Sequence, residues 1–163
     1  LRVRLSLMRD LGATPAPFNS WLNIQGLETL PLRMKQHSIS AMAIAEFLEA
    51  HPKVSKVNYP GLVSDVNHKN ALKYLKGGYS GLLSFEVADK ETAQKIADAT
   101  EIFAVVVNIG DSKSIITHPA STTHQQLSVE ELIDAGIPAG LVRLSVGLED
   151  TQDLIDDLTK ALA

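Results

Sequence analysis

Residues 141–149 read LVRLSVGLE, and the first six of them predict a strand with two very different faces. Side chains alternate between the faces of a strand, so Val142 and Leu144 point to one face and Arg143 to the other. An apolar face of this kind is what a strand presents to a protein core. Arg143 is therefore a single charge in an otherwise apolar strand, on the face opposite to these two side chains.

The guanidinium of Arg143 suggests a binding role. The sequence has only five arginines, and the other four lie within the first 33 residues. A guanidinium presents a rigid fork of N–H donors that suits a carboxylate or a phosphate. The alternative is an arginine on an edge strand that pairs with one of the chain's own carboxylates. The sequence leaves both interpretations open.

Helices and strands interleave along the rest of the chain. Further strands are expected at residues 54–59, 81–88 and 104–107, and the last of these is fully apolar, as in a strand that lies inside a sheet. Helices are expected at residues 1–9, 17–27, 30–50, 64–76, 90–99, 128–135 and 151–162. The pattern predicts a two-layer α+β (α/β) domain, in which helices cover one face of a roughly four-stranded sheet.

The overall composition is that of a globular protein. The chain has 163 residues, of which 45% are apolar and 21% charged, enough for the core of one ordinary domain. Its formal charge of −4 argues against nucleic acid as a partner. Without a bilayer-spanning apolar run or a signal-peptide pattern, we expect no membrane partner and a cytoplasmic location. The absence of cysteine excludes disulfides and thiolate metal sites.

Residues 1–14 are expected to form a helix that ends at Gly12. Leu1 and Leu5 supply apolar positions from the first residue onward, whereas a helix start usually carries Ser, Thr, Asp or Asn as a cap. Two interpretations stay open, a trimmed start or a larger domain that precedes the helix. We assign residues 15–163 to the main domain.

Residues 108–127 show no periodicity and are expected to form a long loop. The segment is rich in short polar side chains and contains Gly110 and Pro119. Loops longer than about 12–15 residues inside compact domains are usually functional or disordered. Exposed amides and hydroxyls of this kind can bind an anion. Alternatively, the polar side chains bond their own backbone in a turn-rich connection.

Other chemistries find less support in this loop. His118 and His124 lie six residues apart, whereas a zinc pair on one helix is spaced by four, so no metal site is expected. Ser121, a histidine and Asp111 are the residue types of a hydrolase triad, but the Gly-x-Ser-x-Gly elbow that exposes such a serine is absent. No glycine-rich dinucleotide or phosphate loop is present either.

Three segments together resemble a known family. Residues 17–33, 108–124 and 142–149 are similar, in this order, to the C-terminal part of the Cys/Met-metabolism family of pyridoxal-phosphate enzymes. The resemblance implies the small C-terminal domain of the type I aminotransferase fold, with a mostly antiparallel sheet. Relatives that make or cleave cystathionine usually have Ser-Leu-Gly-Gly at residues 108–111. The Asn-x-Gly-Asp form here, and the run STTH at residues 121–124, resemble the O-acetylhomoserine sulfhydrylase branch.

The resemblance gives three residues a role in substrate binding. The arginine that matches Arg143 grips the α-carboxylate of the amino-acid substrate. Asn108 matches a position whose main chain or side chain helps to hold that carboxylate, and Thr123 matches a threonine near the same site.

The resemblance also implies what this chain lacks. The family's pyridoxal phosphate lies mainly in a larger preceding domain, on a lysine motif to which none of the ten lysines here belongs. We therefore expect no catalytic residue in this chain, with residues 1–14 linking it to that cofactor domain. We also expect that residues 1–163 alone neither bind the cofactor firmly nor catalyse a reaction.

For the complete enzyme the resemblance implies a γ-replacement in methionine and cysteine biosynthesis, in which sulfide or a thiol replaces the acetate of O-acetyl-L-homoserine. It implies a homo-oligomer, commonly a tetramer, and apolar surface is expected where the larger domain docks. Two alternatives stay open. One is the C-terminal domain of a cystathionine γ-synthase or γ-lyase, and the other is a stand-alone binding or assembly module without catalysis.

Overall fold

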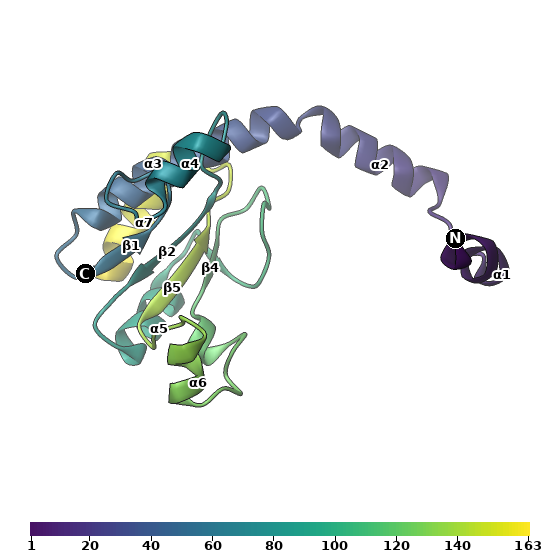
Figure 1. Ribbon diagram of the computed structural model, residues 1–163. Helices are drawn as coiled ribbons and strands as arrows, with labels where there is room; N and C mark the ends of the chain where they lie inside the picture. Colours follow the sequence, from purple (N-terminus) through teal and green to yellow (C-terminus); the bar gives the residue numbers. More distant parts are fainter. The chain divides into compact units, whose positions relative to one another are not determined.

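The structure is a computed structural model that describes all 163 residues and divides into two compact units, Leu1–Leu32 and Arg33–Ala163 (Figure 1). The helices are, in chain order, the π-helix η1 (Val3–Met8), α1 (Arg9–Leu11), α2 (Pro17–Glu28), α3 (Leu30–Glu49), α4 (His68–Tyr74), α5 (Lys90–Ala99), the 3-10 helix η2 (Pro119–Ser121), α6 (Val129–Asp134) and α7 (Thr151–Leu162). The strands are β1 (Lys56–Asn58), β2 (Leu82–Glu86), β3 (Ala104–Val105), β4 (Ile115–Thr117) and β5 (Leu141–Ser145).

The first unit is helical and buries none of its side chains. Helix α1 ends at Gly12, which adopts the left-handed conformation with φ of 67°, as a helix-ending glycine commonly does. Helix α2 begins at Pro17, a residue that suits the first helical turn. Leu11 and Phe18 are 76% and 64% exposed, so this unit presents apolar surface. The two compact units divide after Leu32.

The five strands form one mixed sheet in the order β1-β2-β5-β4-β3. Strands β3 and β4 run parallel, and every other neighbouring pair is antiparallel. This confirms the expected α+β domain with a mostly antiparallel sheet, with one strand more than the four expected. Strand β5 lies in the middle of the sheet, where β2 and β4 pair with its two edges (Figure 1).

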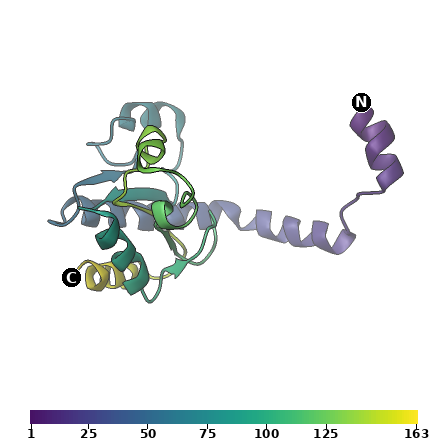
Figure 2. The same ribbon diagram turned by 90° about the horizontal axis from the view of Figure 1, so that it is seen from below.

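One face of the sheet packs against α3, α5 and α7. Phe85 of β2 and both Val142 and Leu144 of β5 are fully buried on this face, which confirms the alternation expected for residues 141–146. Figure 1 shows α3 and α7 behind the sheet, and Figure 2 shows the same layers from below. The helices contribute Ala41, Ile44, Ala45, Leu48, Ala93, Ile96, Ala97, Leu154, Leu158 and Leu162 to this core.

Polar side chains cap the starts of α5, α6 and α7, whereas α4 has no side-chain cap. The Asp89 side chain accepts a hydrogen bond from the Thr92 amide at 2.8 Å and so caps α5. Ser128 and Glu131 form a complete capping box at the start of α6. Asp150 caps α7 by accepting hydrogen bonds from two amides of its first turn. None of the helices has the length and apolar character that crossing a membrane requires.

Two expectations about the strands are wrong. Residues 115–117, expected in a long loop, form the fully buried strand β4. This strand is only three residues long and is followed by His118 and Pro119, so it is too short to show an alternating pattern. Residues 104–107, expected inside the sheet, supply only β3 at its edge, and Val105 is 48% exposed. An apolar run indicates a strand, but tertiary pairing decides which strands lie beside it.

The buried Asp157 of α7 generates a prediction about stability. Its carboxylate accepts hydrogen bonds from the amides of Glu101, Ile102 and Phe103 at 2.9, 2.9 and 3.3 Å. Because Asp157→Ala leaves these amides without an acceptor, we expect it to lower the free energy of unfolding by about 3 kcal/mol. The matched control is Asp156→Ala, on the exposed face of the same helix, with an effect below about 0.5 kcal/mol. Urea unfolding followed by circular dichroism measures both, and equal effects would contradict the prediction.

Candidate functional site

The side chain of Arg143 extends from the face of the sheet opposite to the core. The residues that pair with Arg143 across the sheet are Ser84 of β2 and Thr117 of β4. Its strand neighbours Val142 and Leu144 are 0% exposed and lie on the core face. Three strands thus bring polar side chains to one place on the face without the core helices.

No carboxylate of the chain neutralises Arg143. No carboxylate oxygen lies within 4.0 Å of the Arg143 nitrogens. The ion pairs of the structure join other residues. Its closest polar contact is a long one, 3.5 Å from Nη2 to the main-chain carbonyl oxygen of Asn108. The interpretation that Arg143 pairs with one of the chain's own carboxylates is therefore wrong. Most of its five N–H donors are free to bind a ligand.

A cavity of about 290 Å³ lies beside this guanidinium. Arg143 and Thr123, two of the three predicted site residues, both line this cavity. His124 lines it as well. The third, Asn108, does not line the cavity and reaches the site through its main-chain carbonyl. The remaining lining residues are Asn58, Leu82, Leu83, Ser84, Pro119, Ile137 and Leu141.

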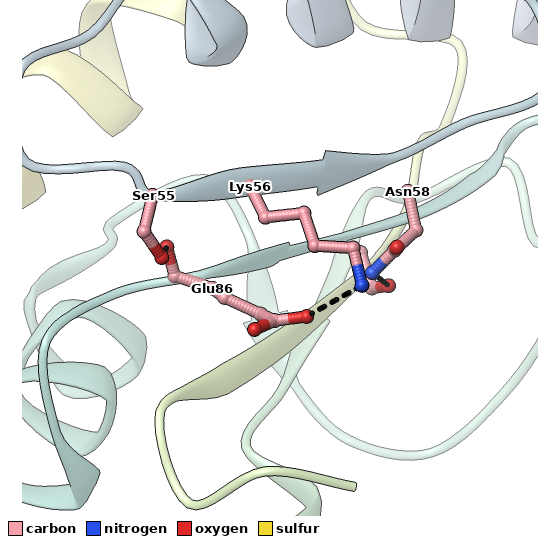
Figure 3. Close-up of polar contacts among 5 residues, drawn as sticks. Ser55, Lys56, Asn58 and Glu86 are labelled. Carbon is pink, nitrogen blue, oxygen red and sulfur yellow. Dashed lines mark hydrogen bonds and ion pairs between the residues drawn. The ribbon is translucent and has the colours of Figure 1, made fainter. Parts of the chain in front are cut away.

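The sequence did not single out the polar side chains of β1 and β2 that extend this site. Asn58 donates to the hydroxyl of Ser84 at 3.1 Å, and both residues line the cavity. Next to them, Lys56 and Glu86 form an ion pair at 3.2 Å between the two strands, as Figure 3 shows. Alternation alone places Ser84 opposite to the buried Leu83. Its position beside Arg143 follows from strand register, which the sequence does not show.

The loop that follows β3 holds itself together through Asp111. One carboxylate oxygen of Asp111 accepts from the Asn108 side-chain amide at 3.0 Å, and the other accepts from the Lys113 amide at 3.1 Å. The Asn108 side chain also accepts from the Ile109 amide at 2.9 Å. The side chain of Asn108 is thus occupied within the loop. Its carbonyl group is the part that contacts Arg143.

His118 is a structural residue of the fold. It is buried, and its Nε2 donates to the Ala139 carbonyl at 2.8 Å. In the neutral ring Nδ1 then accepts from the Ser121 hydroxyl, at 2.8 Å. Both ring nitrogens are used, and no group of three or more His, Asp or Glu side chains is arranged to hold a metal ion. His124 differs because it is half-buried, lines the cavity and lies 2.8 Å from the Thr123 hydroxyl.

This geometry can be compared with known proteins. The family model described as Cys/Met metabolism PLP-dependent enzyme matches residues 2–163. The chain belongs to this family of pyridoxal-phosphate (PLP)-dependent enzymes, as the sequence predicted.

Individual relatives agree with the family match. The chain is 51% identical to the O-acetyl-L-homoserine sulfhydrylase of Leptospira meyeri over 99% of its own length and 37% of that protein's. It is 46% identical to the homocysteine synthase of Schizosaccharomyces pombe, over 98% of this chain and 37% of that one. The chain therefore spans little more than a third of the curated relatives it matches.

A solved structure gives the same result for the fold. A Campylobacter jejuni protein assigned as an O-acetylhomoserine (thiol)-lyase superimposes with a TM-score of 0.90 and 52% identity, over 99% of this chain and 38% of that one. That protein carries a pyridoxyl group on a lysine, which lies outside the part that matches this chain. The expected small domain of the type I aminotransferase fold is confirmed.

Asp111 generates a prediction about the loop. The amide of Lys113 and, after it, the side chain of Asn108 hold the pKa of the Asp111 carboxyl below its ordinary value. The stability that ionised Asp111 contributes is therefore present above its unfolded-state pKa and is lost as the pH falls through the lower folded-state pKa. Asn108→Ala removes one of these donors, so we expect the folded-state pKa of Asp111 to rise toward its ordinary value.

Titration of the Asp111 carboxyl carbon by NMR measures this shift. Asp89 is the internal control. The Thr92 amide lowers the pKa of Asp89 at the start of α5, away from the loop, so Asn108→Ala should leave this pKa unchanged. An Asp111 titration that does not move in Asn108→Ala would contradict the geometry of the loop.

Proposed function

We propose that this chain is the C-terminal, substrate-binding part of a PLP-dependent O-acetylhomoserine sulfhydrylase. The full-length enzyme replaces the acetate on Cγ of O-acetyl-L-homoserine with sulfide or a thiol. The observation that carries the proposal is the unpaired guanidinium of Arg143 beside a cavity that Thr123 also lines. An amino-acid substrate offers the α-carboxylate that such a fork of donors binds.

The three site residues divide the work of binding between them. Arg143 would hold the α-carboxylate through two parallel N–H···O bonds. The Asn108 carbonyl accepts from one N–H of the guanidinium and so limits its rotation. The Thr123 hydroxyl, which also belongs to the lining of the cavity, would donate a further hydrogen bond to the carboxylate. Holding the carboxylate fixes the orientation of the bonds at Cα, which is how a binding residue accelerates a reaction at that carbon.

The residues present do not by themselves fit the cofactor. No lysine lines the cavity beside Arg143, so this chain offers no amine there that could bond an aldehyde. When bound in a complete enzyme of this class, pyridoxal phosphate supplies an electron sink for the electrons of bonds broken at the substrate. We propose that this chain contributes orientation of the substrate and that the cofactor-bonding lysine belongs to the part of the full-length protein outside residues 1–163.

The branch of the family is part of the same proposal. The identity to sulfhydrylases supports it, as does the Asn-x-Gly-Asp form of residues 108–111. Activity of the full-length protein on O-acetylhomoserine plus sulfide, compared with its activity on cystathionine, separates the branches. A preference for cystathionine would overturn the assignment.

The full-length protein is also proposed to be a cytoplasmic homo-oligomer, with residues 1–14 joining this domain to the cofactor domain.

Removal of the guanidinium gives the main test. In the full-length enzyme, Arg143→Ala is expected to lose about 2–5 kcal/mol of substrate binding, because a desolvated carboxylate loses its partner. The KM for O-acetylhomoserine should rise accordingly. Arg143→Lys keeps the charge but not the fork, so its KM should lie between those of the wild type and Arg143→Ala. An unchanged KM in Arg143→Ala would remove the role assigned to this residue.

The isolated chain provides a second test. Residues 1–163, mixed with pyridoxal phosphate and then dialysed, are expected to retain no stable covalent adduct, since no lysine lies in the cavity. Absorbance spectroscopy after dialysis measures the retained cofactor, and bovine serum albumin treated in the same way controls for reversible reaction with surface lysines. A tight, stoichiometric adduct would show that a competent lysine lies within these residues.

A further inference from the structure

Ser114 joins the loop of residues 108–114 to the segment that follows β5. Glu149 accepts from the Ser114 amide through one carboxylate oxygen and from the Ser114 hydroxyl through the other, both at 2.8 Å. The Ser114 hydroxyl in turn accepts from the Gly147 amide at 2.8 Å. Ser114 is fully buried and Glu149 half-buried. We call these three residues, Ser114, Gly147 and Glu149, the Glu149 clamp.

The Glu149 clamp is closely fitted around Gly147. A Cβ atom at this position would lie 2.4 Å from the Glu149 carboxylate and 2.5 Å from the Ser114 amide nitrogen. Both distances are shorter than non-bonded atoms tolerate, so only glycine allows the loop to approach this closely. The clamp therefore fixes where the loop ends relative to β5.

Two further hydrogen bonds attach the loop to the same segment. The Gly110 amide donates to the hydroxyl of the buried Ser145 at 3.3 Å, and the Leu148 amide donates to the Ser112 carbonyl at 2.9 Å. Apolar packing contributes little here, because Ile109 is 62% exposed. The path of the loop thus depends on polar bonds to the residues after Arg143.

We propose that Glu149, acting through Ser114, is a positioning residue for substrate binding by Arg143. The inference rests on the proposed function. Arg143 and two members of the clamp, Gly147 and Glu149, belong to one continuous stretch of chain. The loop that the clamp holds returns its Asn108 carbonyl to the Arg143 guanidinium at 3.5 Å. Loss of the clamp frees the loop, the carbonyl leaves the guanidinium, and the guanidinium loses the orientation that a carboxylate requires.

The test uses the full-length enzyme with its cofactor and three variants, Glu149→Ala, Glu149→Gln and Ser114→Ala. A small misplacement of a binding group costs about 10- to 100-fold in the affected step, so we expect Glu149→Ala to raise the KM for O-acetylhomoserine by that factor. The kcat at saturating substrate should stay close to that of the wild type, since the reacting groups are untouched. Glu149→Gln keeps one acceptor oxygen and should recover much of the loss. Ser114→Ala provides the same measurement if Glu149→Ala fails to fold.

Asp89→Ala is the matched control, because Asp89 is also a carboxylate that accepts from a backbone amide, at the start of α5. It should lower the melting temperature and leave KM unchanged. If the Glu149 and Ser114 variants behave in the same way, the clamp is merely structural and the inference is overturned. If Arg143→Ala leaves KM unchanged, both the proposed function of the site and this inference fail. If Arg143→Ala raises KM and the clamp variants do not, the positioning role alone is wrong.

Discussion

The guanidinium of Arg143 is charged and half-buried, yet no carboxylate in the chain neutralises it. Partial burial of a charge costs free energy unless hydrogen bonds compensate it. The only hydrogen bond that the fold provides to this side chain is the long one to the Asn108 carbonyl. The neighbouring strands hold the backbone of Arg143 in place. Arg143 lies on the middle strand of the sheet, with Ser84 and Thr117 paired on its two sides, so neighbouring strands hold its backbone while the side chain extends toward the cavity.

The stretch of residues 141–149 does three things at once. Val142 and Leu144 pack into the core, which fixes the strand. Arg143, between them, is thereby directed to the opposite face. Gly147 and Glu149 then hold the loop that returns to the guanidinium. The backbone that presents the Arg143 side chain is thus held in place, because it is also a central part of the fold.

The chain belongs to a family of pyridoxal-phosphate-dependent enzymes, and its relatives in the comparisons are longer than this chain. The chain corresponds to little more than a third of its curated relatives, and the pyridoxyl-lysine of the related crystal structure lies outside the matching part. Under the proposed function, orientation of the substrate and the chemistry at its carbon atoms are the tasks of different parts of one protein. The absence of a lysine from the cavity agrees with this division. Residues Leu1–Leu32 expose apolar side chains, the kind of surface that is expected from the sequence where a larger domain docks.

The sequence by itself determined the features that depend on neighbouring residues. Strand alternation placed Arg143 opposite to Val142, and the pattern of residues predicted helices at 90–99 and 128–135, where the structure has α5 and α6, because both effects act over a few residues. The resemblance identified the family and selected Arg143, Asn108 and Thr123. It did not show that Asn108 contacts Arg143 through its carbonyl, since its side chain is taken up within the loop.

Only the tertiary structure decided what depends on pairing between distant segments. Strand β4 is three residues long and carries no periodic signal of its own, so it becomes visible as a strand only when β5 and β3 pair with it. For the same reason the apolar residues 104–107 supply an edge strand rather than an inner one. The positions of Ser84 and Asn58 beside the cavity follow from register, which the hydrogen bonds between strands set and no single segment encodes.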